Sequence, residues 1–382
     1  MYSVASHLDM VTDWVRTGAY QEALRREVRP GCTVADIGTG TGIFAVFACE
    51  FGARRVYAIE PDSIVEVARG VVTANGVGDR VELISEMSTR VELPETVDVI
   101  VSDIGGVLPL FGDAVPSRID ARERLLAADG VLIPMREPLW VAVAEARKPF
   151  HYDLAVLEDG RLGIDLSQAR RFAANAWRKI RLEREELLTE PQRWADLDYR
   201  TIDSPDVRGE VLAKVGRDGI ANGLCIWFDK ELTDDVRFSN APGEPETIYG
   251  QAFFPLREPV AVAAGDSVSI GIEAVLADGD YAWRWRTRVA GKDGTLKASL
   301  DQSTVHSAPV PLARLRRREA SYRAALGTDG EIDRFVLTEM DGQKTLMEIA
   351  ERIVERFPED PGSSDVNEAF RRVARLSERY SR

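Results

Sequence analysis

Three glycines at alternating positions, Gly38, Gly40 and Gly42, join two apolar segments of the chain. The segment before them, Thr33–Ile37, is typical of a buried strand, and the segment after them, Ile43–Phe51, is typical of a helix. Glycines at such a junction allow the backbone to approach a ligand and the helix to pack closely on the strand. The dinucleotide-binding fingerprint requires a glycine at position 43, so the isoleucine found there disfavours NAD.

Strands and helices continue to alternate after this junction. Short apolar segments predict strands at Arg55–Glu60, Val81–Ser85, Val97–Ser102 and Gly130–Pro134, and helices at Ser63–Ala74 and Ala121–Ala127. Upstream, apolar residues recur at helical spacing from Leu8 to Val28, which predicts one or two amphipathic helices. The alternation implies an α/β fold with a parallel, doubly wound, Rossmann-like sheet.

The pattern changes after Pro138, where β-rich segments are separated by turn residues. These segments include Leu139–Val143, Leu224–Phe228, Val268–Ile272 and Tyr281–Arg286, and they predict an antiparallel barrel or sandwich. A helical pattern between Gly163 and Arg181 interrupts this region. From Ala313 the chain is charged and helical, with three predicted helices at Ile332–Met340, Thr345–Phe357 and Val366–Tyr380.

These patterns divide the 382 residues into four parts. We predict N-terminal helices over 1–30, a ligand-binding domain over 31–136, a β-barrel with a helical arm near 163–181 over 137–310, and a C-terminal helical module over 311–382.

Composition restricts the partners of such a chain. The formal net charge of −14 argues against a nucleic-acid partner, which needs clustered Lys and Arg, and suits a cationic or neutral substrate better. The chain shows neither a signal peptide nor a long apolar stretch, so we expect no membrane partner and a cytoplasmic location. Its three cysteines and three histidines lack metal-ligand spacing, and we expect no metal site.

Two carboxylates beside the glycine run suggest the ligand. Asp36 would repel a diphosphate but can accept hydrogen bonds from the ammonium of an amino-acid ligand. Glu60, at the end of the second strand, can accept hydrogen bonds from two ribose hydroxyls. S-adenosylmethionine (SAM) carries both groups, so we predict a SAM site. In the alternative interpretation, the glycines mark only a tight turn and Glu60 only a solvated strand end.

At this point the residues resemble a known family. Asp36–Gly42 resembles the first motif of class I SAM-dependent methyltransferases. The segment His7–Thr17 is similar to the H-x-x-M-L-x-D-x-x-R-T helix of protein arginine methyltransferases, and Val91–Pro94 matches their V-E-L-P turn. Gly163–Ser167 looks like the start of their dimerisation arm. The resemblance covers roughly residues 1–300.

The resemblance implies roles for several residues. It implies that the N-terminal helix closes over SAM, with Arg16 on the SAM carboxylate, Met10 near the sulfonium and His7 nearby. It also implies that Met87 and Ser88 border the adenine, and that the chain forms a homodimer.

The substrate loops depart from the family pattern. The family holds a guanidinium with two glutamates in a segment S-E-x-M-G…E; here Asp103 takes the first position, and the second falls on Gly112, with Asp113 one residue later. The family's T-H-W loop aligns with Thr247, Ile248 and Tyr249. These changes put guanidinium chemistry in doubt, but not cofactor binding.

The candidate catalytic residues therefore keep alternative interpretations. Asp103 or Asp113 could deprotonate an amine acceptor, but Asp103 could equally be a capping or ribose-side residue, and Asp113 could be loop surface. Tyr249 could line the acceptor pocket or serve only in packing. His7 could be no more than a satisfied polar group.

Three functional hypotheses follow. The first is a SAM-dependent methyltransferase that modifies a peptide or peptide-derived natural product on N or O. The second is an arginine N-methyltransferase that acts on protein, with Asp103 and Asp113 in place of the glutamate pair. The third is an inactive SAM-binding regulator.

The C-terminal helix, D-G turn and helix around Asp341–Gly342 bear on the first hypothesis. They are similar to small winged-helix domains that recognise leader peptides in natural-product pathways. Such domains hold a peptide by adding a strand to a sheet edge. The alternative is a helical cap or a dimer contact.

Overall fold

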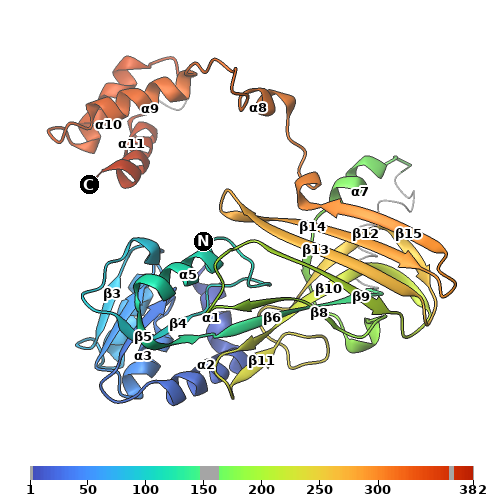
Figure 1. Cartoon of the computed structure of the whole chain (residues 1–382). Coiled ribbons are helices and arrows are strands. Elements are labelled where there is room, and N and C mark those ends of the chain that lie inside the picture. Colours follow the sequence, from blue (N-terminus) through green and yellow to red (C-terminus); the bar gives the residue numbers. More distant parts are fainter. Residues whose placement is uncertain (1–2, 147–162, 361–364, 382) are drawn as a thin grey trace. The chain divides into compact units, whose positions relative to one another are not determined.

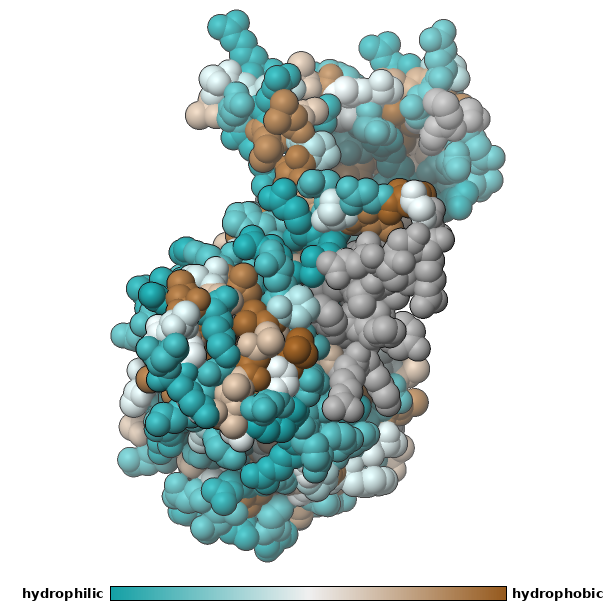
Figure 2. All heavy atoms as spheres, turned by 90° about the vertical axis from the view of Figure 1, so that its right-hand side faces the viewer, coloured by the Kyte–Doolittle hydropathy of each residue, from teal (hydrophilic) through white to brown (hydrophobic). Residues whose placement is uncertain are grey.

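The computed structural model describes residues 3–146, 163–360 and 365–381. The chain forms two compact units, Met1–Pro309 and Val310–Arg382, and each is described here by itself. In the described residues, no helix is long and apolar enough to cross a membrane. Figure 2 shows a face on which hydrophilic side chains predominate.

A five-stranded parallel sheet lies at one end of the first unit, at the lower left in Figure 1. Its strands run in the order β3-β2-β1-β4-β5, namely β1 (Thr33–Ile37), β2 (Arg55–Ile59), β3 (Val81–Ile84), β4 (Val97–Ser102) and β5 (Leu126–Ile133). The predicted doubly wound sheet is confirmed. The strand order reverses between β1 and β4, and ligands of such folds bind at the carboxyl ends of these two strands.

Two helices open the chain, α1 (Val4–Thr12) and α2 (Trp14–Glu27). They are separate because Asp13 lies between them and its side chain caps α2, accepting a hydrogen bond from the Arg16 backbone at 3.0 Å. Helices alternate with the strands of the sheet: α3 (Ile43–Glu50) follows β1, α4 (Val65–Ala74) follows β2, and the short 3₁₀ helix η1 (Ser88–Arg90) follows β3.

The prediction for the last helix and strand of this sheet was wrong in its bounds. Helix α5 covers Ala114–Arg124, seven residues earlier than expected at its start, and β5 begins at Leu126 instead of Gly130. Pro116 lies in the first turn of α5. Proline is tolerated there because the amide of that position has no partner within the helix.

Two antiparallel sheets make up the rest of the first unit (Figure 1). One has the order β7-β12-β10-β6-β8 with β11 beside β10, and the other has the order β15-β14-β13-β9. Their strands are β6 (Arg136–Ala144), β7 (Arg178–Ile180), β8 (Gln192–Asp198), β9 (Val207–Lys214), β10 (Gly219–Glu231), β11 (Arg237–Ser239), β12 (Gln251–Val262), β13 (Ser267–Ala277), β14 (Asp280–Ala290) and β15 (Leu296–Ser303). On β14 alternate residues are buried, including Trp283 and Trp285, so one face of this sheet lies in the core.

The helical arm is shorter than predicted. Within 163–181 only α7 (Ser167–Ala173) is an α-helix, and Arg178–Ile180 is strand β7, which pairs with Gln251–Phe253 of β12. The helix ends at Ala173, and the next carbonyl, Ala174 O, accepts a hydrogen bond from the Gln302 side chain at 2.6 Å instead of from a helical amide. A sequence pattern does not reveal such long-range partners.

The second unit is helical. It contains α8 (Leu312–Arg316), α9 (Thr328–Glu339), α10 (Leu346–Arg356) and α11 (Val366–Tyr380), and its described residues form no strand of a wing. Helix α9 starts four residues before the predicted Ile332, and α10 begins after a capping box of Thr345 and Glu348. Its small core includes Val336, Ile353 and Val373.

Candidate functional site

The glycine run lies at the carboxyl end of β1, in a conformation that requires glycine. Gly38, Gly40 and Gly42 have φ values of +72°, +55° and +82°. A Cβ on Gly38 would lie 2.3 Å from Ile104 Cγ2, and a Cβ on Gly42 would lie 3.1 Å from Ala68 Cβ. A side chain at Gly38 would therefore collide with Ile104, and one at Gly42 would crowd Ala68 of α4.

The Glu60 carboxylate follows β2 and organises this loop. Its Oε2 accepts a hydrogen bond from the Gly40 amide at 3.1 Å, and its Oε1 accepts one from the Asp62 amide at 3.0 Å. The residue is only 8% exposed, so it is not a solvated strand end. Each oxygen retains a further lone pair, with which it could accept a hydroxyl of a sugar.

Asp36 is buried at the end of β1. Its Oδ2 accepts a hydrogen bond from the Thr39 hydroxyl at 2.5 Å, and its Oδ1 has no hydrogen-bond partner among the described residues. Burial raises the pKa of this carboxyl to about 7. An unsatisfied carboxylate oxygen beside a glycine loop fits a ligand with an N–H donor, as the SAM ammonium would supply.

Helix α1 lies against the same loop. His7 Cδ2 is 3.3 Å from the position that a Cβ on Gly40 would take, and His7 Nδ1 is 2.9 Å from Ser3 O. The Met10 carbonyl accepts a hydrogen bond from Arg16 Nη1 at 3.0 Å. The structure thus places His7 at the glycine run and Met10 beside Arg16.

A cavity of about 220 Å³ opens beside Gly38. Its walls are mainly apolar and include Met87 and Ser88, which suits the flat ring of an adenine. Asp113 also borders this cavity, as an exposed residue at the start of α5. Asp113 thus lies apart from the buried cluster around Asp103, and no hydrogen bond or ion pair of that cluster involves it.

Asp103, at the carboxyl end of β4, is the centre of a buried charged cluster. Its Oδ2 pairs with Arg16 Nε, its Oδ1 lies 2.8 Å from Lys230 Nζ, and the Tyr249 hydroxyl lies 2.8 and 2.6 Å from the two oxygens. Burial raises the pKa of Asp103, but Arg16 and Lys230 outweigh it and hold that pKa well below its usual range. Asp103 is therefore a fixed anion and is poorly suited to accept a proton.

Sequence reasoning missed half of this cluster. Glu137 of β6 and Lys230 of β10 are 0% and 1% exposed, and Lys230 Nζ lies 3.0 Å from Glu137 Oε1. The Tyr199 hydroxyl donates to Glu137 Oε2, and Arg118 Nη1 donates to that hydroxyl at 3.1 Å. The sequence signal was a charged triplet, Asp229–Glu231, in which the middle residue turns inward.

The Thr247–Tyr249 loop closes the cluster. The Ile248 amide donates to Asp13 Oδ2 at 2.7 Å, which connects this loop to the junction of α1 and α2. The Tyr249 ring stacks on Phe238 with centroids 6.2 Å apart. Tyr249 therefore both packs and contacts Asp103.

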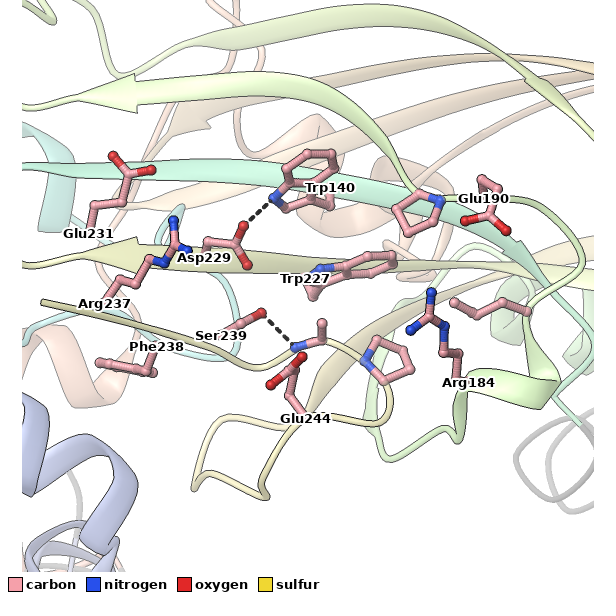
Figure 3. A pocket seen from close by; sticks show the side chains of 14 residues that line it. Trp140, Arg184, Glu190, Trp227, Asp229, Glu231, Arg237, Phe238, Ser239 and Glu244 are labelled. Atoms are coloured by element: carbon pink, nitrogen blue, oxygen red, sulfur yellow. Dashed lines mark hydrogen bonds between the residues drawn. The ribbon is translucent and has the colours of Figure 1, made fainter. Parts of the chain in front are cut away.

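A larger groove of about 660 Å³ lies on the sheet that contains β6, β10 and β11 (Figure 3). Trp140 and Trp227 lie opposite each other on neighbouring strands in its wall, and Trp140 Nε1 donates to Asp229 Oδ2 at 2.8 Å. Phe238 borders this groove and also lies beside the Lys230 ammonium, so the groove adjoins the charged cluster.

Family models match both halves of the first unit. Residues 17–132 match the model described as ribosomal protein L11 methyltransferase (PrmA), and residues 139–288 match the arginine methyltransferase oligomerization subdomain. A curated relative, protein arginine N-methyltransferase 6 of Xenopus laevis, is 32% identical over 276 residues, which are 68% of this chain and 80% of the relative. The chain belongs to the protein arginine N-methyltransferase family.

Other members of the family are similar to this chain in sequence and in fold. The arginine N(omega)-methyltransferase of Streptomyces achromogenes subsp. streptozoticus is 30% identical over 272 residues, 69% of this chain and 74% of that protein. The solved Trypanosoma brucei PRMT1 enzyme-prozyme complex with AdoHcy shares the fold, with a TM-score of 0.72, 22% identity, and coverage of 78% of this chain and 96% of that one. Arabidopsis thaliana protein arginine methyltransferase 10 has a TM-score of 0.69, 25% identity and the same coverage.

The family settles the class of reaction and the cofactor. This member of the protein arginine N-methyltransferase family is a SAM-dependent methyltransferase, and SAM is its cofactor.

Proposed function

We propose that this chain transfers a methyl group to a nitrogen of an arginine side chain in a protein or peptide. One observation carries the proposal: beside the cofactor loop, two buried carboxylates, Asp103 and Glu137, hold a cationic nitrogen, that of Lys230. A place that stabilises one nitrogen cation is suited to another. The names of the relatives support the same acceptor, so the second sequence hypothesis is favoured over the first.

We propose that the residues of the glycine edge hold SAM. Asp36 accepts from its ammonium, Glu60 from its ribose, and Met87 and Ser88 flank its adenine. Gly38, Gly40 and Gly42 let the backbone approach it, while Met10 and Arg16 contact its methionine part. When bound, SAM supplies a methyl group on a sulfonium. The orphaned Asp36 oxygen and the buried Glu60 carboxylate support this assignment.

The residues of the cluster position the acceptor more than they activate it. Methyl transfer is an in-line displacement, in which orientation supplies much of the rate. In this proposal Asp103 stays ionised and attracts the acceptor cation, and Tyr249 holds Asp103 in place. His7, whose Nε2 lies toward Gly40, is the proposed carrier of the released proton. Asp113 has no catalytic role in it, because this residue is exposed at the other cavity.

Labelled SAM and synthetic arginine-containing peptides test the proposal. We expect label on the guanidinium, located by mass spectrometry, and a large loss of transfer in Asp103→Asn. Asp113→Asn is the matched control and keeps wild-type transfer. Label on a carboxyl or amine contradicts the arginine proposal, and transfer to no molecule in any extract favours an inactive regulator.

The second candidate function is the methylation of a peptide or peptide-derived natural product. The acceptor would be a peptide or peptide-derived natural product delivered by the helical unit Val310–Arg382, which exposes Leu337 and Met347, each 43% exposed. Met347→Glu should then raise the KM for a peptide acceptor but not for a blocked single arginine. Equal KM changes for both acceptors contradict this role.

We also propose a homodimer and a cytoplasmic location. The match of residues 139–288 to an oligomerization subdomain and the arm around α7 support the dimer. The three free cysteines, Cys32, Cys49 and Cys225, support a reducing compartment. Light scattering of the purified chain measures its molar mass in solution, and the mass of a monomer at micromolar concentration contradicts the proposed homodimer.

A further inference from the structure

Lys230 is a charged residue that is almost completely buried. It lies on the buried strand β10 between Asp229 and Glu231, and it is 1% exposed. Lysine is almost never fully buried unless it is paired, since removal of its ammonium from water is costly. A lysine in this place therefore needs a specific environment.

That environment is a complete cation site. Lys230 Nζ lies 2.8 Å from Asp103 Oδ1 and 3.0 Å from Glu137 Oε1. It also lies 5.0–5.9 Å from the centroids of four aromatic rings, those of Tyr20, Phe228, Phe238 and Tyr249. Burial lowers the pKa of the ammonium, but Asp103 and Glu137 raise it well above its ordinary value, so Lys230 is charged. Carboxylates and ring faces together are the groups that recognise nitrogen cations.

Each carboxylate of the cluster has an arginine partner besides Lys230. Arg16 pairs with Asp103, and Arg118 Nη1 lies 3.8 Å from Glu137 Oε2. These two arginines already match the two carboxylates, and Lys230 adds a third cation. Among the side chains alone the cluster holds one cation more than its carboxylates, and an acceptor cation that takes the place of Lys230 leaves neither carboxylate unpaired.

We propose that the Lys230 ammonium is an internal occupant of the acceptor's cation site, and that an acceptor binds by displacing it from Asp103 and Glu137. This inference rests on the proposed function. The displacement sets specificity, because an acceptor ammonium would make the same contacts with Asp103 and Glu137 as the Lys230 ammonium and so gains no binding free energy by replacing it. A guanidinium gains, since its planar fork of donors bonds carboxylates at two points. Lys230 is then a specificity-determining residue that favours guanidinium over amine acceptors and lowers the affinity for both.

Calorimetry in the presence of S-adenosylhomocysteine tests the inference. The probes are N-acetyl-arginine amide and N-acetyl-lysine amide, and the variants are Lys230→Met and Lys214→Met, the latter an exposed lysine on β9. Lys230→Met should tighten arginine binding at least fivefold and lysine binding by more, so that selectivity falls. Lys214→Met should match the wild type, and the affinity for S-adenosylhomocysteine should be the same in all three proteins. Unchanged or weaker arginine binding in a folded Lys230→Met protein overturns the inference.

A measurement on the wild-type chain covers the case in which Lys230→Met does not fold. The buried ammonium should give a slowly exchanging ¹⁵Nζ signal, and saturation with N-acetyl-arginine amide should shift or broaden it. A signal that does not change at saturation overturns the inference. If arginine peptides are methylated but these results fail, the inference alone is wrong; if no arginine acceptor is methylated, the proposed function fails and the inference with it.

Discussion

Asp36 should weaken the fold at neutral pH in exchange for ligand binding. Its carboxyl is buried, one oxygen lacks a partner among the described residues, and its pKa is raised from 3.8 to about 7. The native state therefore holds a proton on Asp36 between roughly pH 4 and 7, where the unfolded chain does not. Stability from this group is greatest below pH 4, falls as the pH rises toward 7, and is then constant.

The magnitude follows from the shift. About three pKa units at 1.36 kcal/mol each amount to about 4 kcal/mol over the full range, of which about 2.5 kcal/mol falls between pH 5 and 8. Asp36→Asn keeps the shape and removes the charge. The free energy of unfolding of this variant should therefore gain on the wild type by up to about 2.5 kcal/mol from pH 5 to pH 8.

Ligand binding should respond in the opposite sense. An ammonium donor favours the ionised carboxylate, so wild-type affinity for SAM should rise with pH up to about 7, whereas Asp36→Asn should bind weakly at every pH. Urea denaturation and titration calorimetry in the same buffers measure both effects. Asp129→Asn, at an exposed aspartate on strand β5 of the same sheet, is the control and should bind SAM as the wild type does. A stability difference that is independent of pH, or an unchanged SAM affinity in Asp36→Asn, would refute the reasoning.

Three further substitutions test other parts of the chain. Gly38→Ala adds a methyl 2.3 Å from Ile104 Cγ2 at a positive φ, so it should cost at least about 1–2 kcal/mol in thermal denaturation and weaken SAM binding. Glu60→Ala removes the partner of the Gly40 amide and of the proposed ribose contact; calorimetry should show SAM binding weaker by about 1.5–3 kcal/mol, and equal affinity would retire the assignment. Thr345→Ala removes the cap of α10 and should destabilise the second unit by about 1 kcal/mol in circular dichroism. Tryptophan fluorescence should not change in that variant, because all seven tryptophans precede residue 310.

The sequence was informative wherever a short segment determines its own structure. The run from Asp36 to Gly42 combines a buried strand, positive-φ glycines and a helix start within a few residues, and these local features predicted both the turn and the sheet. The start of the helix predicted from Thr345 agrees with the structure for the same reason, because Thr345 is the N-cap of α10. Errors arose where a distant partner decides: β7 is a strand only because Gln251–Phe253 lies beside it.

The acceptor side of the site shows the same limit more strongly. The resemblance offered Asp113 as a second carboxylate because the family's second glutamate falls on Gly112, one residue before it, with loop surface as the alternative; in the structure Asp113 is exposed and borders the small cavity. The second carboxylate of the cluster is instead Glu137, which arrives on a different strand, and the cation between the two carboxylates arrives on a third, 127 positions after Asp103. The spacing of residues along the chain does not show which side chains of different strands lie together in the fold. The side of a buried strand on which a charged residue lies is more informative. Lys230 of β10 faces inward, and a buried ammonium is stable only beside carboxylates, so its position implies a site that binds cations.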